Sequence, residues 1–330
     1  MIITRTPFRI SFFGGGTDYP AWYKENGGVV VSTTIDKYCY ISCRKLPPFF
    51  EYKHRIVYSK SESVSRLDEI MHPAVREIFR FMDVEEGLEV HHDGDLPARS
   101  GLGSSSAFTV GLLHALYGLK GKMVTKEKLA SESIHIEHNM IKENVGSQDQ
   151  IAASFGGFNK VTFHVDNTFK VAPIILDKAR LKDFKSHLLL FFTGFSRIAS
   201  DVAKAQIIRI DKTKKELSAI HQMVDQSISI LTGNSDLTEF GKLLHESWKL
   251  KRSLSDKVSN KDIDGIYDIA RNAGALGGKI LGAGGGGFML IYAKPQDHEN
   301  IKNKLKNLLL VPFEFENQGS QVVIYSPNGL

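Results

Sequence analysis

The segment that decides the fold of this 330-residue chain reads Pro97-Ala98-Arg99-Ser100-Gly101-Leu102-Gly103-Ser104-Ser105-Ser106-Ala107. It leads into an apolar stretch, residues 107–119, whose pattern predicts a buried helix. The first amides of a helix have no partner inside it, and the positive end of the helix dipole lies there. Glycines and serine hydroxyls at such an end suit a bound anion, so the segment predicts a phosphate-binding loop. A serine-rich helix cap without a ligand is the alternative.

Two further glycine-rich segments lie on either side of this loop. Residues 5–19 read RTPFRISFFGGGTDY, so a predicted strand leads into three glycines and then into the carboxylate of Asp18. Residues 279–288 read KILGAGGGGF. Glycine lets a backbone approach a ligand closely, so both segments are candidate ligand loops. For residues 14–16, an ordinary tight turn is the alternative.

Three common nucleotide-binding motifs do not fit the sequence. Gly282, Gly284 and Gly287 match the spacing GxGxxG, but an apolar strand follows them instead of the helix of a dinucleotide-binding fold. Lys279 is followed by Ile280, which excludes a Walker A loop, and the HRD and DFG motifs of protein kinases are missing. The predicted phosphate-binding loop therefore belongs to another class of protein.

The whole chain mixes strand and helix patterns without a regular βαβ repeat. Predicted strands cover residues 2–12, 28–44, 55–58, 88–92, 158–163, 187–193, 288–293 and 321–325. Predicted helices cover residues 73–82, 107–119, 125–144, 199–231, 236–253, 262–273 and 296–309. This mixed order predicts an α+β fold. We place a domain boundary near residue 180, which gives an N-terminal domain (1–180) and a C-terminal domain (181–330).

Composition and charge narrow the class of protein. The net charge is +5, and the basic residues are interspersed with acids, so we expect no nucleic-acid partner. The longest apolar runs are too short to cross a membrane, and residues 1–5 lack the apolar core of a signal peptide. Cys39 and Cys43 fit buried positions on one face of a strand in a reducing compartment. We therefore expect a cytoplasmic protein, either a monomer or a homodimer, with a small-molecule partner.

In their order and separation, the three glycine-rich segments resemble the three motifs of the GHMP small-molecule kinases, which include galactokinase, homoserine kinase and mevalonate kinase. The resemblance extends from Arg5 to Gly287. The string RTPFRISFFGGGTDYP resembles, more specifically, the bacterial D-glycero-D-manno-heptose 7-phosphate kinases. The resemblance implies a two-domain α+β fold with a ferredoxin-like C-terminal domain and a nucleotide site between the domains. It also implies ATP and Mg²⁺ as cofactors.

The resemblance also implies roles for individual residues. Asp149 matches the catalytic aspartate, with Arg9 beside it, while Ser105 and Glu137 match the protein ligands of Mg²⁺. The nucleotide phosphates would be held by Pro97, Arg99, Ser100, Gly101, Leu102, Gly103, Ser104, Ser105 and Ser106, and supported by Gly284 and Gly285. Gly16, Thr17 and Asp18 would contact the acceptor sugar. Galactokinases carry Glu-His where this chain has Gly15-Gly16, which argues against galactose as the acceptor.

A phosphorylated acceptor needs an additional anion site. The predicted strand 187–193 ends in TGFSRIASD, which opens a helix with an arginine and hydroxyls nearby. We expect Arg197 and Ser200 to contact a substrate phosphate there. An ordinary capped turn between strand and helix is the alternative.

The sequence thus predicts a kinase that transfers the γ-phosphoryl group of ATP to the anomeric hydroxyl of D-glycero-D-manno-heptose 7-phosphate. One alternative is a kinase for another sugar, such as fucose or an unphosphorylated heptose. A non-catalytic sugar sensor on the same fold is the second. The retention of Asp149, Glu137, Ser105 and Arg9 favours an enzyme, because a sensor needs neither a base nor metal ligands.

Overall fold

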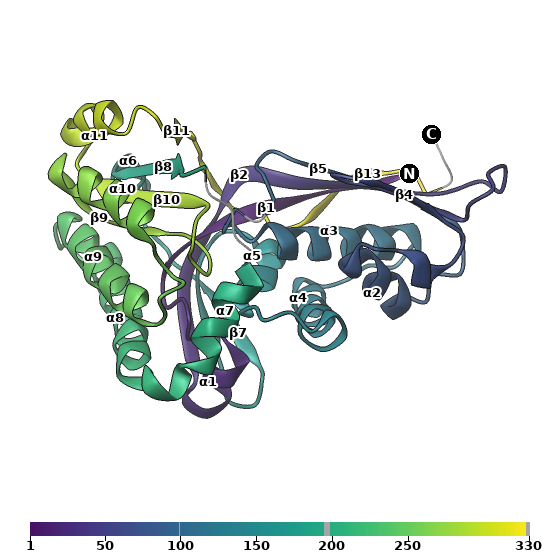
Figure 1. Cartoon of the computed structure of the whole chain (residues 1–330), viewed down its shortest axis with the longest axis horizontal. Coiled ribbons are helices and arrows are strands. Elements are labelled where there is room, and N and C mark those ends of the chain that lie inside the picture. Colours follow the sequence, from purple (N-terminus) through teal and green to yellow (C-terminus); the bar gives the residue numbers. More distant parts are fainter. Residues whose placement is uncertain (99, 195–198, 328–330) are drawn as a thin grey trace.

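The computed structural model describes residues 1–98, 100–194 and 199–327, and it contains two β-sheets with helices packed against both (Figure 1). This mixture of sheets and helices confirms the predicted α+β class. The predictions for Arg99 and Arg197 lie outside the described residues.

The larger sheet has nine strands among the described residues, and most of its pairs are antiparallel. Its main path runs β13-β1-β2-β5-β3-β4, with β6 and β12 also paired to β2, and β7 to β6. The strands are β1 (Ile2–Phe13), β2 (Gly28–Lys45), β3 (His54–Val57), β4 (Ser61–Val64), β5 (Leu88–Gly94), β6 (Phe158–Phe163), β7 (Phe169–Pro173), β12 (Phe315–Glu316) and β13 (Gln321–Tyr325).

The smaller sheet is antiparallel and has the order β11-β8-β10-β9. Its strands are β8 (Leu188–Phe192), β9 (Ala275–Ile280), β10 (Phe288–Ala293) and β11 (Leu309–Leu310). Every residue of β10 is buried, which explains the continuous apolar run in its sequence.

Helices and short helical turns connect these strands. The α-helices are α1 (Pro20–Asn26), α2 (Pro73–Phe81), α3 (Ser104–Leu119), α4 (Lys126–His135), α5 (Gln148–Phe155), α6 (Lys178–Ser186), α7 (Ala199–Ile208), α8 (Lys214–Thr232), α9 (Thr238–Ser253), α10 (Lys261–Asn272) and α11 (His298–Lys304). The shorter turns are η1 (Leu67–Glu69), η2 (Ile136–Ile141), η3 (Ile210–Lys212) and η4 (Pro295–Asp297), of which η2 is a π-helical turn.

The long strand β2 joins the two wings of the larger sheet. Its residues 28–33 pair with β6, and its residues 39–45 pair with β5. Cys39 and Cys43 are buried and free, as the strand pattern predicted. Valine, isoleucine, threonine and tyrosine dominate β2, and such side chains suit a pleated sheet.

Helix α3 fixes the predicted phosphate-binding loop against the sheet. It packs along β1 and β2, where the Thr4 hydroxyl donates to the Gly111 carbonyl at 2.9 Å. Just before the helix, the backbone N–H of Arg9 on β1 donates to the Leu102 carbonyl at 3.0 Å. The N-terminus of α3 therefore lies beside the middle of β1.

The C-terminal part of the chain returns to the larger sheet. Strand β13 pairs with β1, and β12 pairs with β2, so residues 315–325 are hydrogen-bonded to the region that we assigned to the first domain (Figure 1). The boundary near residue 180 stays a prediction. Any division of the chain must allow for this return.

Three predicted helices differ from the observed ones. Residues 199–231 form two helices, because the chain turns through η3 and buries Ile210 between α7 and α8. The predicted helix 125–144 ends as α4 and widens into the π-helical turn η2. The predicted helix 296–309 is shorter, since Leu309 and Leu310 pair with β8 instead. None of the helices in the described ranges is both long and apolar enough to cross a membrane.

Candidate active site

A cavity of about 940 Å³ lies where the three glycine-rich segments meet. The first segment contributes Gly15, Gly16 and Asp18 to its lining, the second contributes the start of α3, and the third contributes Gly282. Helices α7 and α9 add residues from the C-terminal half of the chain. The cavity is therefore built from segments that are more than 250 residues apart in the sequence.

The second and third glycine segments touch backbone to backbone. The N–H of Phe288 donates to the Ser100 carbonyl at 3.2 Å. A Cβ added to Gly101 would lie 2.5 Å from the Leu281 carbonyl oxygen, and one added to Gly287 would lie 2.1 Å from that of Ser100. Both glycines also have positive φ angles, of 82° and 96°. Glycine is therefore required at these two positions by both space and backbone conformation.

Not every residue assigned to the nucleotide loops faces the cavity. Ser104, Ser105 and Ser106 line it together with Gly101 and Gly103, whereas Leu102 is fully buried in the core and Pro97 is exposed outside it. Ser100 is buried, and its carbonyl serves the third loop. Gly284 and Gly285 pack against Val258, whose carbonyl accepts from the Gly285 N–H at 2.9 Å.

Arg9 and Asp149 form a bidentate ion pair at the cavity wall. The Arg9 Nε and Nη2 atoms donate to the two carboxylate oxygens of Asp149 at 2.7 and 2.9 Å. A third donor, Nη1, reaches the Gly101 carbonyl at 2.8 Å, which ties the pair to the loop before α3. Arg9 is 3% exposed, while the side chain of Asp149 is 24% exposed. The carboxylate is thus oriented by a buried guanidinium and keeps one open side toward the cavity.

Asp18 lies next to this pair and is almost completely buried. Its carboxylate accepts hydrogen bonds from the Gly16 N–H and from Nε2 of Gln148, both at 2.9 Å. Burial raises the pKa of Asp18, and the negative charge of Asp149 adds to this effect. Thr17 does not line the cavity, because its hydroxyl donates to the Gly14 carbonyl at 2.8 Å and accepts from the N–H of Val29 on β2 at 3.1 Å.

Glu137 is a buried carboxylate with one unused oxygen. The π-helical turn η2 carries it, and such turns occur often at functional sites. Its Oε2 accepts from the Ser106 hydroxyl at 3.0 Å and from Gln150 Nε2 at 2.6 Å. Its Oε1 has no hydrogen-bond partner among the described residues, although Thr109 lies nearby and donates to the Ser105 carbonyl.

The environment of Glu137 suits a cation. Burial raises the pKa of Glu137 to about 8, and the charge of Glu143 adds to this effect. A divalent cation at the unused oxygen would stabilise the ionised form, and Mg²⁺ prefers oxygen ligands. Ser105 is exposed and lines the same cavity, while Ser106 is the serine that contacts Glu137. The residues present therefore fit a magnesium ion.

Helix α7 covers the cavity from the C-terminal half of the chain. Ser200 lines the cavity, and its hydroxyl accepts from the Asn144 N–H at 3.2 Å. Gln206 donates to the Ala283 carbonyl at 2.8 Å, which ties α7 to the third glycine loop. Ser200 is thus close to the segment that precedes α5, whereas Arg197 is not described.

Two groups of cavity residues were missed by the sequence reasoning. At one end, His72 stacks on Phe108 with ring centroids 4.7 Å apart, and Tyr58 packs edge-on against His72. Burial lowers the pKa of His72 to about 4, so this end carries neutral rings. On the other side lies Lys251 from α9, a buried cation that belongs to no recognised motif. Only its tertiary position reveals it.

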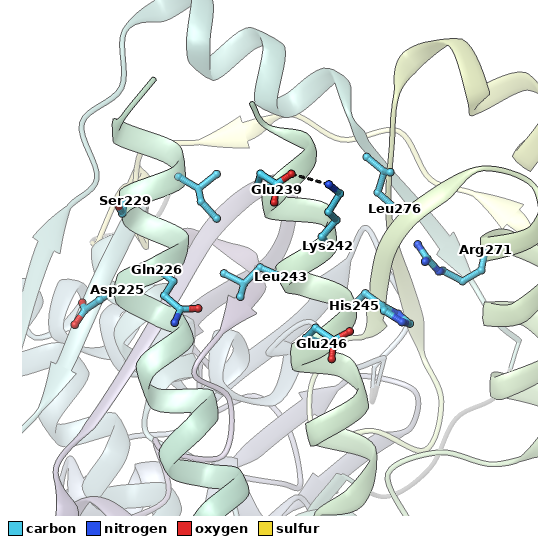
Figure 2. A pocket seen from close by; sticks show the side chains of 11 residues that line it. Asp225, Gln226, Ser229, Glu239, Lys242, Leu243, His245, Glu246, Arg271 and Leu276 are labelled. Atoms are coloured by element: carbon cyan, nitrogen blue, oxygen red, sulfur yellow. Dashed lines mark hydrogen bonds and ion pairs between the residues drawn. The ribbon is translucent and has the colours of Figure 1, made fainter. Parts of the chain in front are cut away.

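A second hollow lies on the outer side of α8 and α9. It has a volume of about 840 Å³ and is lined by residues of α8, α9, α10 and β9, none from a glycine-rich loop (Figure 2). Lys242 pairs with Glu239 at 2.7 Å, and His245 Nδ1 lies 2.7 Å from the hydroxyl of Tyr267. We call this hollow the outer groove.

The cavity thus combines the elements of phosphoryl transfer. A helix N-terminus with three serines can bind phosphate oxygens, and Glu137 can help to hold a divalent cation. Asp149 can accept a proton from an alcohol placed on its open side. The neutral rings of Tyr58, His72 and Phe108 offer a flat, apolar surface at the far end.

Known proteins share this architecture. The family model of the GHMP kinases N terminal domain matches residues 69–157, and the model of the GHMP kinases C terminal domain matches residues 228–309. The D-glycero-alpha-D-manno-heptose 7-phosphate kinase of Campylobacter jejuni is 28% identical over 92% of this chain and 93% of its own length. The galactokinase of Pyrococcus furiosus is 23% identical over 96% of this chain and 95% of its own length.

Solved structures agree on the fold. The crystal structure of a D-glycero-D-manno-heptose 1-phosphate kinase from Bacteroides thetaiotaomicron matches with a TM-score of 0.80 at 24% identity, over 99% of this chain and 100% of that chain. The galactokinase of Lactococcus lactis in complex with galactose matches with a TM-score of 0.73 at 16% identity, over 98% and 95% of the two chains. Since both domain descriptions match in the expected order and solved members share the fold, the chain belongs to the GHMP kinase family and is a phosphotransferase with an alcohol group as acceptor.

Proposed function

We propose that this protein uses ATP and Mg²⁺ to phosphorylate the anomeric hydroxyl of D-glycero-D-manno-heptose 7-phosphate. The observation that carries the phosphoryl-transfer part is the Arg9–Asp149 pair, which is hydrogen-bonded to the loop before α3 and open toward the cavity. The choice of acceptor is supported by the relative from Campylobacter jejuni, which is named as a kinase of this heptose 7-phosphate and aligns over nearly the whole chain.

The nucleotide would lie along the cavity from the serine loop to the ring cluster. The first amides of α3 and the hydroxyls of Ser104 and Ser105 would hold its phosphates. The adenine would occupy the apolar end beside Tyr58, His72 and Phe108, where its flat ring can pack against neutral aromatic side chains. Ser105 and Glu137 would contribute protein oxygens to Mg²⁺, which neutralises phosphate charge when it is bound.

Asp149 would act on the acceptor hydroxyl. As the bond from the acceptor oxygen to the γ-phosphorus forms, the bond from that phosphorus to the ADP oxygen breaks, and the hydroxyl proton passes to Asp149. Arg9 would keep the carboxylate in place through its two hydrogen bonds. A base held in this way typically contributes about 10² to 10⁴ in rate.

The acceptor would lie between the first glycine segment and α7. Gly16 and Asp18 line that part of the cavity, and Ser200 faces it from α7. We expect Asp18 to hydrogen-bond sugar hydroxyls and Ser200 to contact the substrate phosphate. Thr17 would act indirectly, because its two backbone hydrogen bonds hold the turn that carries Asp18.

The experiment that tests this function measures ADP release over a panel of acceptors. The panel contains the heptose 7-phosphate, the unphosphorylated heptose, fucose and galactose, and phosphorus–proton coupling in the product identifies the modified hydroxyl. We expect the highest kcat/KM with the heptose 7-phosphate and a phosphate on its anomeric oxygen. Fucose as the best acceptor would replace the proposed substrate, whereas turnover of none of them, despite sugar binding, would favour a sensor.

A further inference from the structure

Lys251 is a buried cation that the proposed mechanism has not used. It lies in the last turn of α9, is 6% exposed and lines the active-site cavity. Its Nζ donates to the Gly282 carbonyl and, at 3.5 Å, toward the Ile280 carbonyl. An ammonium group has three N–H donors, and both of these acceptors are neutral. In the described part of the chain, no carboxylate lies within ion-pair distance of it.

The ammonium group of Lys251 has no carboxylate of its own among the described residues. It interacts electrostatically with the carboxylates of Asp18 and Asp149, and the positive charge of Arg9 repels it. Asp149 is already matched by Arg9 in a bidentate pair, and Asp18 is held by neutral donors. Neither carboxylate is therefore a direct partner of the Lys251 ammonium group. A buried charge without a partner is costly, so this region favours an anionic ligand.

Lys279 does not face that ligand site. It is 3% exposed, does not line the cavity, and its Nζ donates to the Phe12 carbonyl at 2.9 Å inside the protein. Burial lowers the pKa of Lys279 well below its usual value. Burial also lowers the pKa of Lys251, to about 8, and the negative charges of Asp18 and Asp149 oppose this effect. Of these two buried lysines, Lys251 is the one that lines the cavity with Arg9 and Asp149.

The anchor of Lys251 places it close to the phosphate loop. A Cβ added to Gly282 would lie 2.6 Å from the Cα of Gly101, so the carbonyl that holds Nζ belongs to a loop in direct contact with that before α3. Gly101 is also the residue whose carbonyl accepts from Arg9. Lys251 therefore approaches the same point as the Arg9–Asp149 pair, but from the C-terminal half of the chain.

We propose that Lys251 is a catalytic residue whose ammonium group donates a hydrogen bond to the phosphoryl group while it passes from ATP to the acceptor hydroxyl. During transfer, the oxygen–phosphorus bond to the acceptor forms, the bond to the ADP oxygen breaks with its electron pair, and the acceptor proton goes to Asp149. Negative charge is then spread over the phosphoryl oxygens, and a fixed cation beside them lowers the barrier. The inference rests on the proposed function in so far as ATP is the donor.

The competing explanation is that Lys251 only anchors the third glycine loop. A glutamine at this position separates the two roles, because its amide can still donate to the Gly282 carbonyl but carries no charge. The matched control is Lys249→Gln, two residues earlier on α9, where the exposed ammonium pairs with Glu246.

The test compares kcat, both KM values and thermal midpoints of Lys251→Gln, Lys251→Met and Lys249→Gln with the wild type. We expect kcat to fall by about 100-fold in both Lys251 variants, with the KM for ATP within about threefold. Lys249→Gln should stay within about twofold in every constant. Near-normal kcat in Lys251→Gln would overturn the proposal in favour of a loop anchor. An inactive wild type would instead count against the proposed function.

A binding measurement tests the contact between Lys251 and the transferred phosphoryl group without turnover. ADP with aluminium fluoride, Mg²⁺ and acceptor imitates the phosphoryl group in transit, while ADP with Mg²⁺ and acceptor does not. We expect the Lys251→Met midpoint to rise with ADP as much as the wild-type midpoint does, and the further rise with aluminium fluoride to be lost. If the variant keeps that further rise, or if ADP itself no longer stabilises it, Lys251 does not contact the transferred group.

Discussion

The active-site cavity and the outer groove have nearly the same volume, about 940 and 840 Å³, but their polar groups differ in the partners that they have. In the outer groove, Lys242 and Glu239 pair with each other (Figure 2). Arg271 donates to the Ala275 carbonyl. In the cavity, and within the part of the chain that the structure describes, Glu137 keeps one buried oxygen without a hydrogen-bond partner, and Lys251 is held only by carbonyls. Size therefore does not separate the two hollows, whereas the partners of their polar groups do.

Solvent explains this difference. The side chains of Lys242 and Glu239 are 63% and 49% exposed, so water screens their charges and the pair contributes little to stability. Glu137 is 1% exposed and cannot be stabilised by water. A protein retains such a buried, poorly satisfied group when a ligand completes its environment. Matched substitutions in the two hollows test whether this distinction holds.

The largest expected effect follows from removing the proposed base. Asp149→Asn keeps the size of the side chain and an oxygen for Arg9, but the amide cannot take up the hydroxyl proton. We expect kcat to fall by about 10² to 10⁴, with ADP affinity nearly unchanged, as measured by steady-state kinetics and calorimetry.

The matched control for Asp149→Asn lies in the outer groove. Asp225→Asn makes the same chemical change at an aspartate that pairs with Lys160 on the surface. Its kinetic constants should stay within about twofold of the wild type. Equal losses in the two variants would remove the distinction between the hollows.

A smaller effect is expected at the candidate magnesium ligand. Glu137→Gln preserves the shape of the side chain but removes its charge, so the Mg²⁺ concentration that gives half-maximal activity should rise by about 10- to 100-fold. Titration of activity with Mg²⁺ measures this shift. Glu239→Gln in the outer groove is the control, and its magnesium dependence should match that of the wild type. An unchanged magnesium dependence in Glu137→Gln would exclude Glu137 as a ligand.

The stability of the metal-free protein should depend on pH through the same group. Burial raises the pKa of Glu137 from 4.5 to about 8, so the folded protein binds a proton between these values that the unfolded chain has released. Stability from this group is therefore complete below pH 4.5 and is lost as the pH rises toward 8. Each pH unit across this window corresponds to about 1.4 kcal/mol at most.

Thermal midpoints in EDTA at pH 6 and pH 8 test this dependence. The wild type should lose more stability over this interval than Glu137→Gln, because glutamine does not ionise. Added Mg²⁺ should raise the wild-type midpoint more at pH 8 than at pH 6, since the ion binds the ionised carboxylate. Identical pH dependence in the two proteins would show that Glu137 is not the group responsible.

Local patterns in the sequence predict much of the fold. The predicted strands 158–163, 288–293 and 321–325 have the observed bounds of β6, β10 and β13, because their β-branched and aromatic residues suit a sheet. Strand β9 was missed, since its sequence ALGGKI carries two glycines and resembles a loop. The break at η3 was also missed, because it depends on the burial of Ile210 against other elements.

The candidate site was predictable only where a motif marks it. The position of Asp149 beside Arg9, 140 residues earlier, came from the family resemblance, and spacing alone could not show it. The contact of Ser106 with Glu137 depends on the π-helical turn, which no pattern in the sequence predicted. Lys251 lies in the sequence KLKR at the end of a helix and looks like a solvent-exposed lysine. Its burial results from the third glycine loop, which packs over it in three dimensions.

The smallest expected effect tests the outer groove directly. Lys242→Ala removes the ammonium group of an exposed pair, so the free energy of unfolding should change by less than about 1 kcal/mol. The KM values for ATP and acceptor should stay within about twofold of the wild type, because Lys242, His245 and Arg271 already have partners within the protein. A clear rise in either KM would mean that a hollow with satisfied, exposed charges can also bind substrate. In that case buried, unsatisfied groups would no longer be sufficient to tell the two hollows apart.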